Sequence, residues 1–306
     1  MGADAVVMQE NTEIKDGALI LSHPVRCGDH LRHRAEDMAV GACVVPSGTR
    51  LAPQHIAAIA SAGWAEVRVA SRLRIGLLVT GSEIHEAGQD IGGGQSGAIW
   101  DSNTPMLQAS LDPANTVLTD IERVPDTHEA VQAAFARLAG RVDLIVTTGG
   151  ISVGEEDHVK PALVRQGGQI GFSGVAVKPG KPVSFGTLGP TYWLGLPGNP
   201  QAAFVMWHLF GTLLIDRMLG AVCAVPKRQM AVLASDLHHK PGRCELRLAH
   251  HTGHDGLGRQ TVQSETGTHS GRVGVLAQAT GVILIPAETR HLPAGALVDY
   301  HPLSCL

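Results

Sequence analysis

The chain has 306 residues, of which 44% are hydrophobic and 17% are charged, a length and hydrophobic content that favour two or three domains. The formal net charge of −4 at pH 7 argues against a protein that binds nucleic acid along its length. No apolar run approaches the ~18 residues of a membrane span, so no membrane association is expected.

The five cysteines indicate a reducing compartment, because their number is odd, their spacing is wide and no CxxC pair occurs. The first ten residues, MGADAVVMQE, lack the basic and apolar regions of a signal peptide. We therefore expect a cytoplasmic protein.

Residues 1–70 are expected to form a partial, β-rich N-terminal domain. Short strands are predicted at 3–9, 41–53 and 65–70, and a small helix at 54–63 is expected to end at Gly63. The apolar strand at the very first residues, with no lead-in, is typical of a shortened form of a longer protein.

Residues 71–222 alternate strand and helix patterns. The runs RIGLLVTG and VDLIVTTGG are typical of strands buried on both faces. Helices are predicted at 103–112, at 126–140 with Asp126 as the N-cap, at 157–168 and after Pro200. Repeated strand–helix units predict a three-layer α/β domain with a mostly parallel sheet.

Two further patterns complete the chain. Residues 174–188 read as a hairpin with Pro179 and Gly180 at its turn. Residues 223–306 hold short β-type runs between glycine, proline and polar turns, which predict a small C-terminal β-barrel or sandwich domain.

Ligands of open parallel sheets sit beyond the carboxyl ends of the strands, where the TTGG turn is the first candidate. Gly149 and Gly150 let the backbone approach a ligand and present N–H groups, and the helix start adds positive potential, which suits a phosphate. The alternative is a tight strand-to-helix turn without a ligand.

Acidic residues follow several of the same strands, namely Glu83, Asp101, Asp126 and Asp157. Together they favour Mg²⁺ between carboxylates and phosphate, because magnesium prefers oxygen ligands. The alternative for Asp126 and Asp157 is helix capping. Lys178 and Lys181 flank Pro179–Gly180. Their ammonium groups are expected to face one anion; the alternative is that they are solvated at an exposed tip.

These motifs, in this order, resemble the molybdopterin molybdenumtransferase family, which includes the E-domain of gephyrin. The resemblance rests on TGSEI, GAIWDSNTPML, TTGGISVGEEDHVK, VKPGKP and GLPGNPQAAF, and it continues through residues 270–286, 2–13 and 34–53. It implies insertion of molybdenum from molybdate into adenylylated molybdopterin, with Mg²⁺ and release of AMP, in a homodimer.

The resemblance also implies roles for single residues. Glu83, Asp126 and Asp157 would form the acidic metal and molybdate region, with Lys178 and Lys181 offsetting oxyanion charge. Asp37 would reach the cleft across the dimer. The residues implied to line the nucleotide and pterin cleft are Asp101, Asn103, Thr148, Gly149, Gly150, Ser152, Pro197, Gly198, Asn199, Pro200, Ser270 and Arg272.

The sequence departs from the family pattern in three ways. The family is longer at its N-terminus, a basic residue is usual where Gly174 stands, and a glycine is usual where Ala35 stands. These departures leave open a molybdopterin-binding or scaffold protein without the full reaction. A molybdopterin adenylyltransferase is the third reading, although those enzymes lack the C-terminal β domain. Such an adenylyltransferase, or an acceptor molybdoenzyme, is the protein partner expected.

Overall fold

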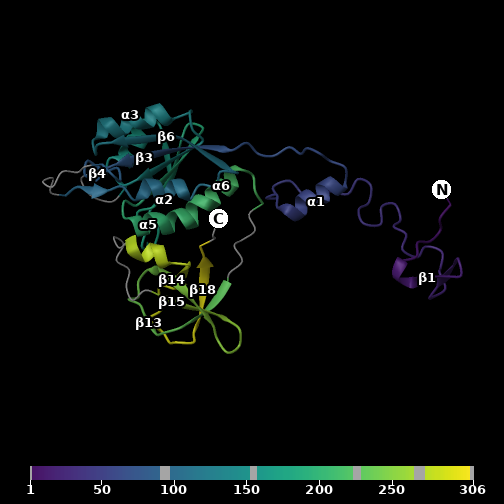
Figure 1. The fold of residues 1–306 in the computed structure, drawn as a ribbon. Helices are drawn as coiled ribbons and strands as arrows, with labels where there is room; N and C mark the ends of the chain where they lie inside the picture. Colours follow the sequence, from purple (N-terminus) through teal and green to yellow (C-terminus); the bar gives the residue numbers. More distant parts are fainter. Residues whose placement is uncertain (1, 90–96, 152–156, 223–228, 265–272, 304–306) are drawn as a thin grey trace. The chain divides into compact units, whose positions relative to one another are not determined.

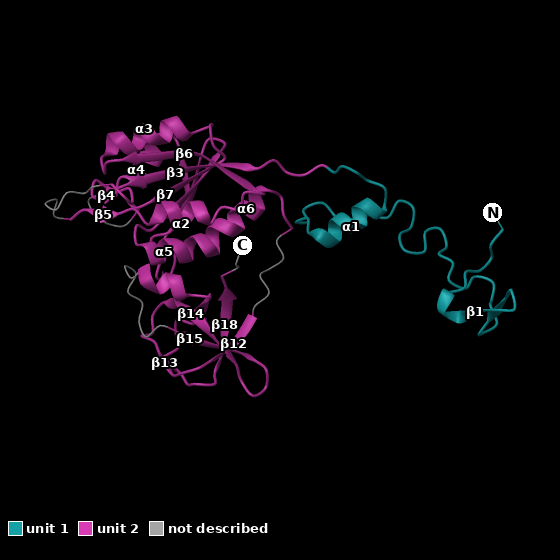
Figure 2. Ribbon diagram, viewed as in Figure 1, with its two compact units in different colours: residues 1–67 teal, residues 68–306 magenta. Residues whose placement is uncertain are grey.

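The structure is a computed structural model that describes residues 2–89, 97–151, 157–222, 229–264 and 273–303. Two compact units divide the chain, residues 1–67 and residues 68–306, drawn in teal and magenta in Figure 2. No helix in the described ranges combines the length and hydrophobicity needed to cross a bilayer.

The first unit has little regular structure. A 3-10 turn, η1 (Gln9–Asn11), precedes a hairpin of β1 (Thr12–Lys15) and β2 (Ala18–Leu21), and α1 (Pro53–Ser61) follows. The chain leaves α1 at Gly63, whose φ of 87° matches the predicted helix end. The strands predicted at 3–9, 41–53 and 65–70 are wrong: no pairing strand for them is present among the described residues, and apolar Val6 stays 47% exposed.

The second unit is built on a six-stranded sheet in the order β6-β3-β7-β11-β10-β8 (Figure 1). Its strands are β3 (Leu73–Thr80), β6 (Thr116–Val124), β7 (Leu144–Thr148), β8 (Gln169–Ser173), β10 (Ser184–Leu188) and β11 (Thr191–Leu196). The first four in the order run parallel. β10 is antiparallel to both of its neighbours, so β8 runs in the same direction as the first four. The predicted mostly parallel sheet is confirmed.

Helices cover both faces of this sheet. On one face lie α3 (His128–Leu138) and α4 (Val159–Arg165), and on the other lie α2 (Asn103–Ala109), α5 (Pro200–Met206), a π-helical turn η2 (Trp207–Gly211) and α6 (Thr212–Met218). Side chains of successive strand residues point to opposite faces of the sheet, so Leu77 packs in the core on one face and Leu78 in the core on the other. This is the predicted three-layer arrangement.

Two local predictions are wrong. Thr127, not Asp126, caps α3: its Oγ1 accepts the backbone N–H of Ala130 at 3.3 Å, since Asp126 lies one residue too early. Residues 174–188 do not form a two-stranded hairpin. Instead β9 (Val177–Lys178) pairs in parallel with a strand of the C-terminal barrel, and β10 pairs with β8.

The C-terminal part is a closed five-stranded barrel in the order β15-β12-β18-β16-β14, with β14 returning to β15. The strands are β12 (Gln229–Leu233), β14 (Cys244–His254), β15 (Gln260–Ser264), β16 (Gly281–Ile285) and β18 (Leu297–Pro302). Shorter elements are β13 (Leu237–His238), η3 (Val273–Gln278) and β17 (His291–Leu292). The barrel prediction is confirmed, while the predicted domain boundaries at 70/71 and 222/223 stay predictions.

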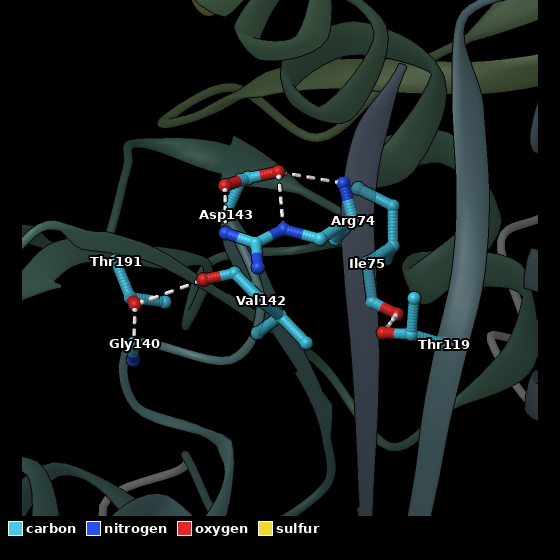
Figure 3. Close-up of polar contacts among 7 residues, drawn as sticks. All are labelled: Arg74, Ile75, Thr119, Gly140, Val142, Asp143 and Thr191. Atoms are coloured by element: carbon cyan, nitrogen blue, oxygen red, sulfur yellow. Dashed lines mark hydrogen bonds and ion pairs between the residues drawn. The ribbon is translucent and has the colours of Figure 1, made fainter. Parts of the chain in front are cut away.

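Polar side chains fasten the amino ends of the parallel strands (Figure 3). Arg74 Nη2 donates to Asp143 Oδ1 at 2.8 Å, and its backbone N–H donates to Oδ2 at 2.7 Å. Buried Thr191 Oγ1 accepts from the Gly140 N–H at 3.0 Å and donates to the Val142 carbonyl at 2.9 Å. These bonds tie the turn before β7 to the starts of β3 and β11, which fixes their register.

Thr191→Val is expected to destabilise the protein by about 1–3 kcal/mol, because it removes two hydrogen bonds and leaves the buried Val142 carbonyl without a partner. Thr119→Val removes one bond, from Thr119 Oγ1 to the Ile75 carbonyl at 3.2 Å, and we expect it to cost about 0.5–1.5 kcal/mol. Urea unfolding measures both. Equal stability of the two variants and the wild type would contradict the role given to Thr191.

Candidate functional site

The sheet register brings three strand ends together. Val79 of β3 and Leu196 of β11 both pair with Thr148, the last residue of β7. Thr80 and Thr148 are each 2% exposed at this carboxyl edge. The loops that begin at Gly81, Gly149 and Pro197 therefore start side by side, as the α/β topology predicts.

Close packing explains the two glycines of the TTGG turn. Gly149 and Gly150 have φ values of 86° and 60°. A Cβ on Gly149 would lie 3.1 Å from the Thr80 carbonyl oxygen and from its Oγ1, and one on Gly150 would lie 2.8 Å from Val159. Only glycine suits both positions. The Gly149 N–H, expected to face a ligand, donates instead to the Leu196 carbonyl at 3.3 Å.

Buried polar atoms without partners concentrate around this turn. Among the described residues, five such atoms lie at this edge: Thr80 Oγ1, Asn103 Oδ1, Thr104 Oγ1, Thr148 Oγ1 and Asp157 Oδ1. The two others are His128 Nε2 and Trp207 Nε1. Folded proteins pair nearly all such atoms or bind water or a ligand with them. Their grouping at one sheet edge indicates a polar ligand with both donors and acceptors.

Asp101 and Asn103 join this edge through α2. Asp101 Oδ1 accepts the backbone N–H of Thr104 at 2.9 Å, so Asp101 caps the helix. Asn103 Nδ2 donates to the Gly198 carbonyl at 2.7 Å. Gly198 in turn packs on Gly149, since a Cβ added to Gly198 would lie 3.5 Å from Gly149 Cα. The GLPGNP turn is thus held against the TTGG turn.

The carboxylates predicted to bind metal differ in their surroundings. The Asp157 side chain is only 14% exposed, and Lys160 Nζ lies 2.9 Å from its Oδ2. Burial raises the pKa of Asp157 above its ordinary value, although hydrogen bonds from Lys160 oppose the shift. Glu83 is exposed and Asp126 is half-buried. No group of three or more His, Cys, Asp or Glu residues in the described part could hold a metal ion.

The two predicted lysines lie in the loop between β8 and β10. Because Ser184 of β10 pairs with Gly195, this loop leaves the sheet at the same edge as the TTGG turn. Lys178 Nζ lies 3.7 Å from Glu245 Oε1, a carboxylate of the barrel that is 3% exposed. Lys181 is exposed. Lys178 therefore has an acidic partner that the sequence did not indicate.

Several other predicted residues have simple positions. Pro197 is buried, Asn199 is exposed as the N-cap residue of α5, and Pro200 opens that helix as predicted. Asp37 is exposed in the first unit, with its carboxylate 3.8 Å from Arg32. Ser152, Ser270 and Arg272 lie outside the described residues.

Sequence reasoning missed Thr80, Thr104, Lys160 and Arg123. Thr80 carried a usable signal, because a hydroxyl that ends a buried parallel strand falls at the ligand-binding edge. Lys160 stands three residues after Asp157, the spacing at which helical side chains meet. Thr104 and Arg123 depend on long-range pairing and gave no local signal.

Asp157→Asn is expected to stabilise the protein increasingly as the pH rises. Because the pKa is raised in the folded protein, the carboxyl of the unfolded chain ionises at a lower pH than that of the folded protein. The wild type therefore loses stability as the pH rises through the folded-state pKa, whereas a variant with asparagine, which does not ionise, loses none. Asp143→Asn should do the opposite, because the bonds from Arg74 lower the pKa of Asp143. Thermal unfolding at about pH 4 and about pH 7.5 measures both. If the stability relative to the wild type changes in the same direction with pH for both variants, the pKa directions given to Asp157 and Asp143 are contradicted.

Comparisons with known proteins agree with this architecture. Residues 76–217 match the family described as "Probable molybdopterin binding domain", residues 1–63 match "MoeA N-terminal region (domain I and II)", and residues 230–303 match "MoeA C-terminal region (domain IV)". Among solved structures, a molybdopterin biosynthesis MoeA protein from Pyrococcus horikoshii superposes with a TM-score of 0.76 at 24% identity. It covers 98% of this chain and 72% of its own, which shows the fold.

Curated relatives extend the match to the whole chain. A molybdopterin molybdenumtransferase of Haemophilus influenzae is 31% identical over 307 residues, covering 100% of this chain and 75% of the relative. Molybdopterin molybdenumtransferase 2 of Mycobacterium tuberculosis is 31% identical over 311 residues, covering 99% of this chain and 74% of the relative. The chain therefore belongs to the molybdopterin molybdenumtransferase family, whose members are enzymes of molybdenum cofactor biosynthesis.

Proposed function

We propose that this protein inserts molybdenum from molybdate into adenylylated molybdopterin and releases AMP. The observation that carries the proposal is the group of buried, unpartnered polar atoms around the TTGG turn. The substrate would satisfy them, because its phosphates and rings offer both acceptors and N–H donors. The hydroxyls of Thr80 and Thr148 would donate to phosphate oxygens, and Asn103 Oδ1 would accept from a ring N–H group.

The lysine loop would supply the positive charge that the reaction needs. Lys178 and Lys181 would gather the molybdate anion and offset the charge that develops as AMP leaves. Lys178 is suited to this because its ammonium is half exposed and only loosely paired with Glu245, at 3.7 Å. The Lys178 ammonium could therefore turn from Glu245 to a bound anion, and Glu245 would keep its ion pair with Arg247.

Mg²⁺ fits one carboxylate of the site. Asp157 Oδ1 is a buried oxygen without a partner, and magnesium commonly takes one or two protein carboxylates plus substrate phosphates. Asp126 and Glu83 would complete the acidic region. A bound Mg²⁺ would neutralise phosphate charge. The protein's own part is to orient Asp157: Lys160 holds Oδ2 at 2.9 Å, which would leave the unpartnered Oδ1 for the cation.

The remaining features of the proposal rest on the family resemblance. The protein would act in the cytoplasm as a homodimer, in which Asp37 approaches the cleft of the other subunit. Ser152, Ser270 and Arg272 would complete the cleft wall. A molybdopterin adenylyltransferase would supply the substrate, and a molybdoenzyme would accept the product.

Release of AMP from adenylylated molybdopterin, with Mg²⁺ and with or without molybdate, tests the proposal. We expect molybdate-dependent release by the wild type and a loss of roughly 100-fold or more in Asp157→Asn, as for removal of one charge-stabilising group. Asp120→Asn is the matched control, because Asp120 is similarly buried, at 18% exposed, and paired with Arg141 at 2.9 Å. It should retain full activity.

The other outcomes are equally informative. Tight nucleotide binding without any release by the wild type would favour the binding or scaffold alternative. An active Asp157→Asn protein would contradict the role given to Asp157 and leave the family's reaction to other carboxylates.

A further inference from the structure

Arg123 lies at the same sheet edge as the candidate site. It is the penultimate residue of β6 and pairs with Val79, one residue before Thr80. Its side chain is 33% exposed, and it reaches two carboxylates: Nη1 lies 2.9 Å from Glu86 Oε1, and Nη2 lies 3.5 Å from Asp101 Oδ2. Arg123 therefore connects the strand end to the loops on either side of residues 90–96.

Asp101 depends on this guanidinium. The Asp101 side chain is 3% exposed, and in the described part of the chain Arg123 is the only cation within ion-pair distance of it. A buried carboxylate needs polar partners on its oxygens. Arg123 supplies a partner to Oδ2, and Oδ1 accepts the Thr104 N–H at 2.9 Å at the start of α2.

The start of α2 is what places the ligand groups. Asn103 donates to the Gly198 carbonyl at 2.7 Å, and the GLPGNP turn in turn packs on Gly149. Asn103 Oδ1 and Thr104 Oγ1 are left buried and unpartnered. A continuous chain of contacts therefore runs from Arg123 through Asp101 and Asn103 to the turn beside TTGG.

We propose that Arg123 is a positioning residue of this site, which holds Asp101 so that α2 presents Asn103 and Thr104 to the substrate. Its contacts are to Glu86 and Asp101, so its effect passes through Asp101. The activity part of this inference rests on the proposed function, whereas the positioning part does not. Arg137 and Arg141 offer a contrast, because each pairs with one carboxylate of the same strand, Glu122 or Asp120, and reaches no described residue of the candidate site.

The test compares Arg123→Met with Arg137→Met. Both remove a guanidinium that is paired with a carboxylate, at 2.9 Å in each case. Hydrogen exchange of the intact protein without substrate is read at residues 101–107 and at Gly149, whose N–H donates to the Leu196 carbonyl. Arg123→Met should speed exchange there about tenfold, while Arg137→Met leaves these segments unchanged.

Steady-state kinetics then separates positioning from general destabilisation. With adenylylated molybdopterin as substrate, Arg123→Met should raise KM about tenfold with kcat changed less than about threefold, because ground-state contacts are loosened. Arg123→Lys should recover part of the loss, since a lysine restores the charge beside Asp101 but not the two-sided bridge. Should Arg123→Met fail to fold, Glu86→Gln is the second variant, and it should give the same local exchange pattern more weakly.

Two results would overturn the proposal. One is identical exchange at 101–107 and at Gly149 in Arg123→Met, Arg137→Met and wild type. The other is faster exchange spread over β3, β6 and α3 as well, which would mean a structural role only. If the wild type releases no AMP, the proposed function fails, yet the exchange comparison still decides whether Arg123 positions this edge.

Discussion

The parallel register of β3, β7 and β11 is the constraint on which the rest of the site depends. Because Val79, Thr148 and Leu196 stand in line, three loops leave the sheet at one edge. A slip of one residue would turn every side chain of a strand to the opposite core. The bonds of Arg74, Asp143 and Thr191 at the amino edge hold that register, far from the residues that would meet a ligand.

The same edge is built at some cost to stability. Buried hydroxyls without partners and a desolvated Asp157 each disfavour the folded state. Such features persist where function requires them, and surrounding packing compensates. Here the two apolar cores on either face of the sheet supply that packing. A ligand that pairs these atoms would therefore also stabilise the protein.

In the part of the chain that the structure describes, a short strand pairing brings the barrel to the site. β9 lies beside the start of β14, so the lysine loop of the α/β part and buried Glu245 of the barrel meet at Lys178. Arg247 holds the same carboxylate at 2.9 Å. The charge available to an anion at this edge thus depends on both parts of the second unit.

Much of the fold and part of the candidate site could be predicted from the sequence, wherever a local pattern determines the structure. Unbroken apolar runs gave β3 and β7, Pro200 gave the start of α5, and the order of the motifs gave the family. Two of the failures share a physical cause, which is competition from a neighbour in space or in sequence. Thr127 is one residue nearer to the helix amides than Asp126, and the edge of β14 draws β9 away from the expected hairpin. The bonds of Arg123 to Asp101 and of Lys178 to Glu245 join segments far apart in sequence, where no local spacing indicates them.

A crystal structure of this protein with AMP and molybdate would test the central claim most directly. We expect the AMP phosphate beside Gly149, within hydrogen-bond distance of the Thr80 and Thr148 hydroxyls, and the adenine or its attached groups near Asn103. AMP bound away from the TTGG turn, with the hydroxyls of Thr80 and Thr148 still unpartnered, would contradict the account.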